Sequence, residues 1–288
     1  MWAVNPPTKT ATEAVTDCAK NIGNRSLRDR VTKAIPEFTA NSANLQADIH
    51  AHQLHLATRQ SYPISNVTEE ELKDLYKRLR RPDGKARHIY DYLMANARHG
   101  LCSYCQYAVV TALDHFVPIT VIESIGIDPW NLVPSCDRCN KNMLDEFPNQ
   151  PDKQPLHPYS HPFSVSEDLR WLHARIHPGP TVAVTFFAAP DDSVSPLLRS
   201  RIVNQFDRLD LAPLYAIVAA RELSGTCRLL ASQFPGGQPD HVTEFLGELS
   251  RDGFASDPND RRGVMYDALS RNEWFINGGY EATGDDSV

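Results

Sequence analysis

The sequence lacks any uninterrupted apolar run of about 18 residues, so it predicts no membrane-spanning helix. Its first ten residues, MWAVNPPTKT, lack the apolar core of a secretory signal, and we expect a cytoplasmic protein. An internal repeat is also missing, and so is a glycine-rich loop for phosphate groups. These absences argue against a repeat architecture and against nucleotide hydrolysis by this chain.

Positive charge is scarce as well. The 29 lysines and arginines are outnumbered by 36 acidic residues, which gives a net charge of −7. A protein that grips a long polyanion is often basic, so any surface for nucleic acid must be local or be supplied partly by a partner. An acidic tail, residues 281–288, contributes to this excess, and we expect it to be disordered. The 288 residues, 41% of them hydrophobic, suffice for one large or two small domains.

Cysteine is rare, but four of the six cysteines form two CxxC pairs, Cys102/Cys105 and Cys136/Cys139. Thiolates suit tetrahedral zinc, and a structural zinc site takes four of them. Four unrelated buried cysteines and two disulfides are the alternatives, but paired CxxC turns without a secretory signal favour metal. We therefore predict one structural Zn²⁺, which is chemically closed and is not the catalyst. The two other cysteines, at positions 18 and 227, are interpreted as buried small apolar residues.

Polar residues suited to hydrolysis accompany the two CxxC pairs. Asp114 and His115 lie between the pairs, Asn131 precedes the second pair, and Asn140 follows it. A carboxylate is a hard ligand for Mg²⁺ or Mn²⁺, and such a cation stabilises the leaving oxygen of a phosphodiester. A histidine near its own pKa can take the proton of the attacking water. Consecutive side chains on a regular strand point to opposite faces, so Asp114 and His115 can converge only at an irregular strand end.

The order C-x-x-C, D-H-F-x-P and N-L-V-P-x-C-x-x-C-N, within residues 101–147, resembles the HNH endonuclease family with an embedded zinc ribbon. This resemblance implies a ββα-metal finger, in which two short strands and a helix hold a divalent cation. It assigns His115 as the general base, and Asp114 and Asn140 as ligands of a catalytic Mg²⁺ or Mn²⁺. Asn131 matches the asparagine that holds a loop in that family.

One position departs from the family pattern. Such motifs often carry a basic residue three positions after the final asparagine, where this chain has Met143. Lys141 is the nearest basic residue and becomes the candidate for a phosphate contact.

A predicted helix pair precedes the central module. Thr68 and Glu71 form a capping-box pattern before the sequence EEELKDLYKRLRR, Pro82-Asp83-Gly84 predicts a turn, and a second helix is expected from Ala86 to Ala97. Basic residues gather on this pair: Lys77, Arg78, Arg80, Arg81, Lys85, Arg87 and Arg98. They are either a solvated helix face with ion pairs or a phosphate-contacting collar. We assign Arg78, Arg80, Arg81 and Lys85, together with Lys141, to nucleic-acid binding.

The sequence predicts mostly helices in the regions that flank the module. In residues 1–62 we expect three helices, at Thr12–Ile22, at Leu27–Phe38 and over 43–59. Pro36 lies near the end of the second. The histidines of the third, His50, His52 and His55, are interpreted as a polar helix face. Residues 148–162 predict a loop, in which His157 either completes the metal site, touches phosphate or pins the loop. Beyond it the patterns predict helices at Ser166–Ile176, Ser195–Asp207, Ala212–Gln233, Val242–Arg251 and Arg261–Trp274, and a strand at Thr181–Ala188.

These patterns together predict an α+β fold: a helical region (1–98), an HNH module with a zinc ribbon (99–162), a mostly helical scaffold or partner-docking region (163–280) and the tail. The predicted activity is metal-dependent hydrolysis of phosphodiester bonds in nucleic acid, with DNA favoured. The helical flanks and His157-Pro158-Tyr159 resemble HNH proteins of bacterial anti-phage defence systems, which implies an ATPase as a possible partner. The alternative is a zinc-ribbon module that has lost catalysis and binds nucleic acid or protein.

Overall fold

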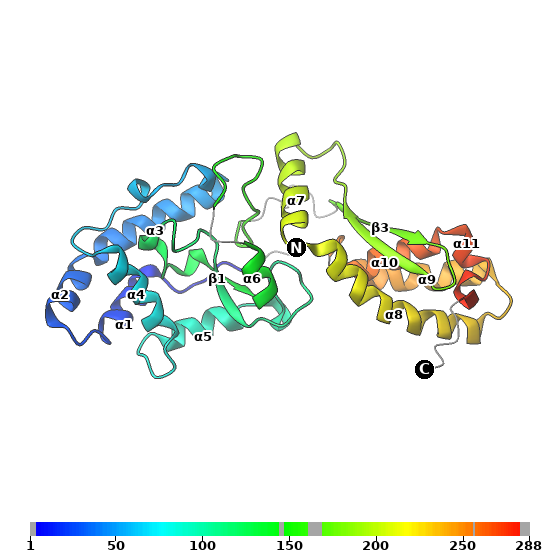
Figure 1. Cartoon of the computed structure of the whole chain (residues 1–288), viewed down its shortest axis with the longest axis horizontal. Coiled ribbons are helices and arrows are strands. Elements are labelled where there is room, and N and C mark those ends of the chain that lie inside the picture. Colours follow the sequence, from blue (N-terminus) through cyan, green and yellow to red (C-terminus); the bar gives the residue numbers. More distant parts are fainter. Residues whose placement is uncertain (1–3, 144–146, 161–168, 256, 283–288) are drawn as a thin grey trace. The chain divides into compact units, whose positions relative to one another are not determined.

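The computed structural model describes residues 4–143, 147–160, 169–255 and 257–282. The chain forms two compact units, residues 1–162 and 163–288 (Figure 1). Within the described residues, helices dominate both units and each unit contains one two-stranded sheet, so the fold class is α+β. Residues 1–98 and 99–162 lie within the same unit.

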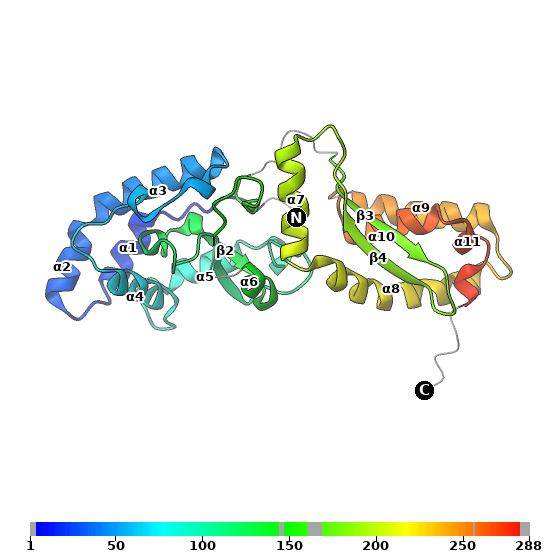
Figure 2. The same cartoon turned by 45° about the horizontal axis from the view of Figure 1, so that its top comes forward.

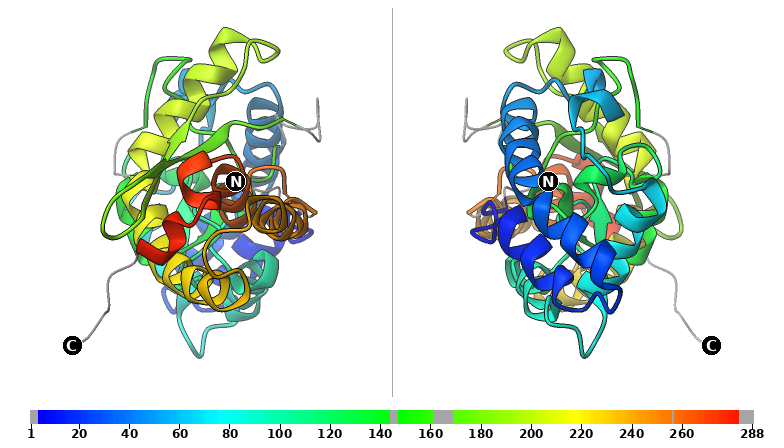
Figure 3. Two further views of the ribbon diagram at one scale, coloured as in Figure 1. Left: turned by 90° about the vertical axis from the view of Figure 1, so that its right-hand side faces the viewer. Right: turned by 90° about the vertical axis from the view of Figure 1, so that its left-hand side faces the viewer.

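The helices that precede the central module are α1 (Ala11–Ala19), α2 (Arg25–Lys33), α3 (Ile35–His50), α4 (Glu69–Arg80) and α5 (Arg87–Ala95), and the last three contact it. They are the blue and cyan ribbons that face the viewer in the right-hand view of Figure 3. Leu75 and Leu79 of α4 and Ile89 of α5 are buried in one core with Leu113 and Leu132, which belong to the module's strands. The helices therefore share a hydrophobic core with the strands that carry the predicted site residues.

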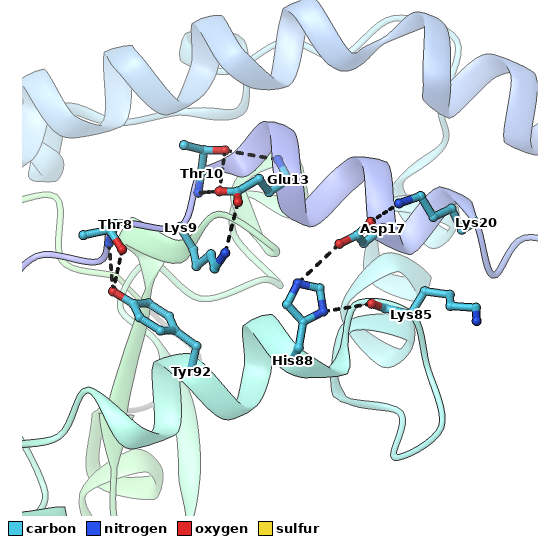
Figure 4. Close-up of polar contacts among 9 residues, drawn as sticks. All are labelled: Thr8, Lys9, Thr10, Glu13, Asp17, Lys20, Lys85, His88 and Tyr92. Atoms are coloured by element: carbon cyan, nitrogen blue, oxygen red, sulfur yellow. Dashed lines mark hydrogen bonds and ion pairs between the residues drawn. The ribbon is translucent and has the colours of Figure 1, made fainter.

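Local hydrogen bonds fix the ends of these helices. Thr68 and Glu71 form the predicted capping box at α4, and the Asn24 side chain accepts from the Leu27 amide at α2. Figure 4 shows a further capping box, Thr10 with Glu13, at the start of α1. In the same view, His88 of α5 lies 3.5 Å from the Asp17 carboxylate, which links α1 to α5.

The boundary between α2 and α3 differs from the prediction. The expected helix Leu27–Phe38 is interrupted at Ala34, and the expected helix over 43–59 begins at Ile35 and ends at His50. Proline lacks an amide hydrogen and is tolerated in the first turn of a helix, so Pro36 begins α3 instead of ending α2. A turn with His52 at φ 56° and a short 3₁₀ helix, η1 (Leu54–Leu56), follow.

The module consists of β1 (Ala112–His115), β2 (Leu132–Ser135) and α6 (Asp137–Met143). The strands pair antiparallel, with Ala112 opposite Ser135 and His115 opposite Leu132. Four short 3₁₀ helices, η2 (Arg59–Ser61), η3 (Arg98–Gly100), η4 (Glu123–Ile125) and η5 (Pro129–Asn131), lie in the surrounding connections. Residues 147–160 contain no helix or strand, as predicted for this loop.

The C-terminal unit contains β3 (Leu172–His177), β4 (Ala183–Ala188), α7 (Pro196–Arg208), α8 (Leu211–Gln233), α9 (Pro239–Phe254), α10 (Arg261–Ser270), α11 (Glu273–Ile276) and η7 (Gly279–Ala282). The two strands form an antiparallel hairpin, with α8 in contact with β4 and α10 with β3 (Figure 2). None of the helices in the described parts of the chain is long and apolar enough to cross a membrane.

The predicted helix Ser166–Ile176 is wrong where the structure describes it, because Leu172–His177 is a strand. Burial there alternates: Leu172 and Ile176 are buried, whereas Arg175 and His177 are exposed. This period of two is that of a half-buried strand, and β4 supplies its partner. The first residues of that predicted helix, 166–168, lie outside the described residues.

Candidate functional site: a four-cysteine cluster beside an Asp-His strand

Cys102, Cys105, Cys136 and Cys139 are buried, and their sulfurs all lie within 4.8 Å of one another. The sulfurs of Cys105 and Cys136 are 4.0 Å apart. Zinc–sulfur bonds of about 2.3 Å in a tetrahedron place the sulfurs about 3.8 Å apart. The donor set, burial and spacing therefore fit a closed structural zinc site.

Two tight turns aim the sulfurs at one point. In the first, the Cys102 amide donates to the Ala108 carbonyl at 2.8 Å, and Gln106 adopts a left-handed φ of 58°. The Ala108 amide then donates to the Cys105 sulfur at 3.5 Å. In the second turn, the Cys139 amide donates to the Cys136 sulfur at 3.4 Å. Amide hydrogens directed at sulfur stabilise the thiolate, which is the form that binds metal.

The four thiols perturb one another. Hydrogen bonds with the neighbouring sulfurs raise the pKa of Cys102 and Cys139. Such bonds lower the pKa of Cys105 and lower the pKa of Cys136 to about 7. The cluster by itself thus favours a mixture of thiols and thiolates, whereas a divalent cation would stabilise all four thiolates.

Asp114 is a buried carboxylate on β1, and the Tyr104 hydroxyl donates a hydrogen bond to its Oδ2 at 2.6 Å. Burial raises the pKa of Tyr104, so its hydroxyl stays protonated and remains a donor. Tyr104 lies between Cys102 and Cys105 in the sequence. The first cysteine turn thereby orients the carboxylate that the sequence assigns to the catalytic cation.

His115 is half-buried at the end of β1. A carbonyl can only accept, so the 2.8 Å contact between His115 Nε2 and the Gly126 carbonyl oxygen places the proton of the neutral ring on Nε2. The Tyr76 ring meets the imidazole edge-on, with a centroid distance of 4.3 Å. Burial lowers the pKa of His115 to about 4. The ring is therefore neutral at pH 7, and its Nδ1 is left as the basic nitrogen.

The acceptor for His115 occupies a close-packed position. A Cβ on Gly126 would lie 2.6 Å from Cδ1 of Ile119, so a larger residue here would have to push the Ile119 side chain aside. Asn131 holds the same loop: its Nδ2 donates to the carbonyls of Val117 at 3.0 Å and Ile125 at 3.3 Å. Its Oδ1 accepts from the Val117 amide at 2.8 Å. The Asn131 side chain thus ties the loop together, which is the role that the resemblance implies for it.

Asn140 is half-buried on α6, and α6 contacts β1. Its amide donates to the Cys136 carbonyl at 2.9 Å, and its side chain has no hydrogen bond within the described residues. Asp114 and His115 leave β1 toward different partners, Tyr104 and Gly126. The structure therefore places the three predicted catalytic residues on two neighbouring elements, with Asp114 and His115 directed apart as expected for consecutive strand residues.

The predicted basic collar divides into two groups. Arg78 is half-buried and donates to the Asn21 carbonyl at 2.8 Å and to Asp74 at 3.2 Å, so its charge is compensated within the fold. Arg80, Arg81 and Lys85 are exposed. Arg81 lies 3.7 Å from Asp83, and the Lys85 side chain extends away from its neighbours in Figure 4. On α6, the exposed Lys141 pairs with Asp137 at 2.7 Å.

His157 lies buried in the loop after the module. Its Nδ1 accepts from the Tyr159 amide at 3.2 Å, its ring lies 4.2 Å from that of Phe116, and its Nε2 has no partner within the described residues. Burial lowers the pKa of His157 to about 3. This environment fits the loop-pinning interpretation of His157.

The sequence reasoning missed Tyr104, Tyr76 and Gly126. Only Tyr104 carried a local signal, as the bulky aromatic residue inside the first CxxC pair.

Comparison with known proteins found one likeness over nearly the whole chain. Protein ea31 of Escherichia phage lambda is 23% identical over 296 residues, which cover 94% of this chain and 98% of that protein. No family model and no solved structure matches the chain.

Proposed function

We propose that this chain is a metal-dependent endonuclease of the HNH type that hydrolyses phosphodiester bonds in nucleic acid, with DNA as the favoured substrate. One observation carries the proposal: His115 is a neutral imidazole whose Nε2 proton is held by the Gly126 carbonyl, which leaves Nδ1 as a base. His115 lies on β1, the first strand of an arrangement of two strands and a helix (β1, β2 and α6). One cysteine pair precedes β1, and the other lies at the start of α6. A general base must be deprotonated at the working pH, and His115 satisfies this requirement.

Each residue then has a role. His115 takes the proton of the attacking water at Nδ1, and Asn131 holds the loop that fixes the ring. Asp114 and Asn140 are the residues that would hold Mg²⁺ or Mn²⁺, which supplies positive charge against the phosphate and the departing 3′ oxygen. Tyr104 orients Asp114, and a structural Zn²⁺ on the four cysteines stabilises the module. By resemblance, the products carry a 5′ phosphate and a 3′ hydroxyl.

The first prediction concerns His115→Ala, assayed on plasmid with Mg²⁺ or Mn²⁺. We expect cleavage to fall by about two to four orders of magnitude, the usual contribution of a general base. Zinc content and affinity for nucleic acid should stay near wild type, and the melting temperature should fall, because the Gly126 carbonyl loses its donor. His241→Ala, an exposed histidine of the C-terminal unit, is the matched control and should cut normally. Cleavage at the wild-type rate by a folded His115→Ala protein would remove this residue from the mechanism.

A zinc-ribbon module without catalysis is the second candidate, and Met143 favours it, because the family often has a basic residue at this position. This candidate predicts that wild-type protein binds nucleic acid but does not cut it with either metal. The link to anti-phage defence and an ATPase partner stays a prediction from the resemblance.

A further inference from the structure

The β3–β4 hairpin belongs to an acid-free part of an acidic chain. From Leu169 to Ala189 the sequence contains no Asp or Glu, although the whole chain has a net charge of −7. The same stretch contains two arginines and two histidines, Arg170, His173, Arg175 and His177. The hairpin is therefore a local cationic segment of the kind that an acidic protein needs if it is to hold a polyanion.

One face of the hairpin is exposed, and its side chains form a mixed aromatic and cationic cluster. Phe187 is 38% exposed and lies opposite His173 in the strand register. The His173 ring stacks on it, with centroids 5.6 Å apart and planes 23° apart. The Arg175 guanidinium lies 5.6 Å from the centroid of the same ring. Helices α8 and α10 contact the strands, whose alternate residues, Leu172, Ile176, Val184 and Phe186, are buried.

A hollow of about 480 Å³ lies between β3, α10 and the end of α9, and His173 and Arg175 of the exposed face also line it. Its lining includes three arginines, Arg170, Arg175 and Arg271, and one carboxylate, Asp267. Arg271 lies 2.8 Å and Arg170 3.7 Å from that carboxylate. Three positive charges against one negative charge leave a net +2 in the lining, and Arg175 has no carboxylate partner within the described residues.

We propose that this hairpin surface, composed of Arg170, Arg175, Phe187 and Arg271, binds single-stranded nucleic acid. Guanidinium groups match phosphate oxygens in their fork geometry, and an exposed ring beside a guanidinium can stack on any base. An acidic peptide would use the arginines but would gain little from the exposed ring. The choice of nucleic acid as the polyanion rests on the proposed function, whereas the cationic and aromatic surface does not.

The test uses the full chain and a fluorescein-labelled single-stranded DNA of mixed sequence, in buffer without divalent metal so that no cleavage occurs. The variant is Arg175→Gln with Phe187→Ala. The matched control is Arg221→Gln with Arg228→Gln, two exposed arginines of α8. By anisotropy titration we expect the hairpin variant to bind about tenfold more weakly or worse, because it loses a stacked base and a phosphate contact. The slope of log affinity against log salt should fall by about 0.7 for that phosphate. The α8 control should keep an affinity for the oligonucleotide close to that of wild type.

Each further outcome has a defined meaning. Wild-type affinity and salt slope in the hairpin variant would overturn the inference. If the melting temperature of the double variant is lowered, the binding of Arg175→Gln alone tests the inference. This exposed side chain makes no ion pair within the described structure, so its replacement should not affect folding. Equal loss in the α8 control would show a general charge effect and would also overturn it. Polyglutamate that binds wild type as tightly as the DNA, and loses affinity in the variant, would assign the surface to an acidic protein instead. Plasmid cleavage by a wild-type protein with no affinity for the oligonucleotide would refute this inference and leave the proposed function intact.

Discussion

A single side chain, that of Tyr104, connects the cysteine cluster to the Asp114 carboxylate. It belongs to the first cysteine turn, and its hydroxyl donates to Asp114 at 2.6 Å. Removing a hydrogen bond that orients a metal-binding carboxylate typically costs affinity for the metal or activity, while the carboxylate itself remains.

We therefore expect Tyr104→Phe to retain zinc and to need more Mn²⁺ for cleavage, with activity about 10- to 100-fold lower at limiting metal. Cleavage rates measured across a Mn²⁺ titration check this. Tyr107→Phe, an exposed tyrosine of the same turn, is the control. An unchanged Mn²⁺ dependence in Tyr104→Phe would argue that Asp114 does not hold the catalytic cation.

His157 makes the N-terminal unit sensitive to acid. Its pKa is about 3 in the folded chain, against 6.5 for a solvated histidine. The unfolded state takes up the proton first as pH falls, so the contribution of His157 is fully present above about pH 6.5 and declines toward pH 3. Relative to pH 7.5, the loss at pH 4.5 should be about 2–3 kcal/mol.

His157→Phe keeps an aromatic ring against Phe116 and removes this titration. We expect the variant to lose less stability between pH 7.5 and pH 4.5 than wild type does, as measured by urea unfolding at both pH values. The loss of the contact with the Tyr159 amide lowers the stability of the variant equally at both pH values. It therefore cancels in the difference between pH 7.5 and pH 4.5. His241→Ala should follow wild type, and an equal acid loss in His157→Phe would assign the sensitivity to other groups.

Helix α4 carries basic residues with two different roles. Arg78 donates to a carbonyl and a carboxylate inside the unit, whereas Arg80 and Arg81 are exposed near the end of the helix. We expect Arg78→Ala to lower the free energy of unfolding by about 1–2 kcal/mol. The pair Arg80→Gln and Arg81→Gln should leave stability unchanged, weaken nucleic-acid binding and flatten its salt dependence.

Thermal melts and anisotropy titrations of the two variants check the α4 prediction side by side. An unchanged salt slope in the exposed pair would make these residues a solvated helix face. A normal melting temperature for Arg78→Ala would show that its two hydrogen bonds contribute little.

Local chemistry explains which elements the sequence predicted. The cap at Thr68 depends on Glu71, three positions later, so it can be read directly from the sequence. Leu172–His177 was misread as helix because its strand character depends on pairing with residues 183–188. Pro36 was placed near the end of a helix, although proline is also tolerated in the first turn, where it lies in α3.

The same reasoning separates the parts of the site. Cysteine spacing predicted the cluster, because two CxxC turns each specify a pair of adjacent ligands. Tyr104 and Gly126 were missed because their hydrogen bonds to Asp114 and His115 join residues 10 and 11 positions apart across turns of irregular backbone. The direction of a side chain at such turns depends on the folded module.

At the scale of the whole molecule, the chain forms two compact units, and the cysteine cluster belongs to the first. Binding energy at a structural zinc site is folding energy for the region that contains it. Loss of the metal should therefore unfold residues 1–162 selectively.

We expect metal analysis to give about one zinc per chain and calorimetry to give two transitions. A strong chelator should abolish the unfolding transition of the N-terminal unit, whichever of the two it is. The transition of the C-terminal unit should stay in place. Cys227→Ala, which changes a buried cysteine of the C-terminal unit, should keep full zinc content. Well under one zinc per chain, or equal loss of both transitions, would contradict this.

The position of Tyr104 inside the first cysteine turn also couples the candidate cutting site to oxidants. Peroxide that converts Cys102 or Cys105 to a sulfenic acid, or joins two of the clustered sulfurs, removes thiolate ligands and disturbs the turn that holds the tyrosine hydroxyl against Asp114. Damage at sulfur is thus transmitted to the carboxylate by a residue that lies directly between the two thiols. Preparations handled without a reductant should lose cleavage together with zinc, and the arginines of the β3–β4 hairpin should be chemically untouched.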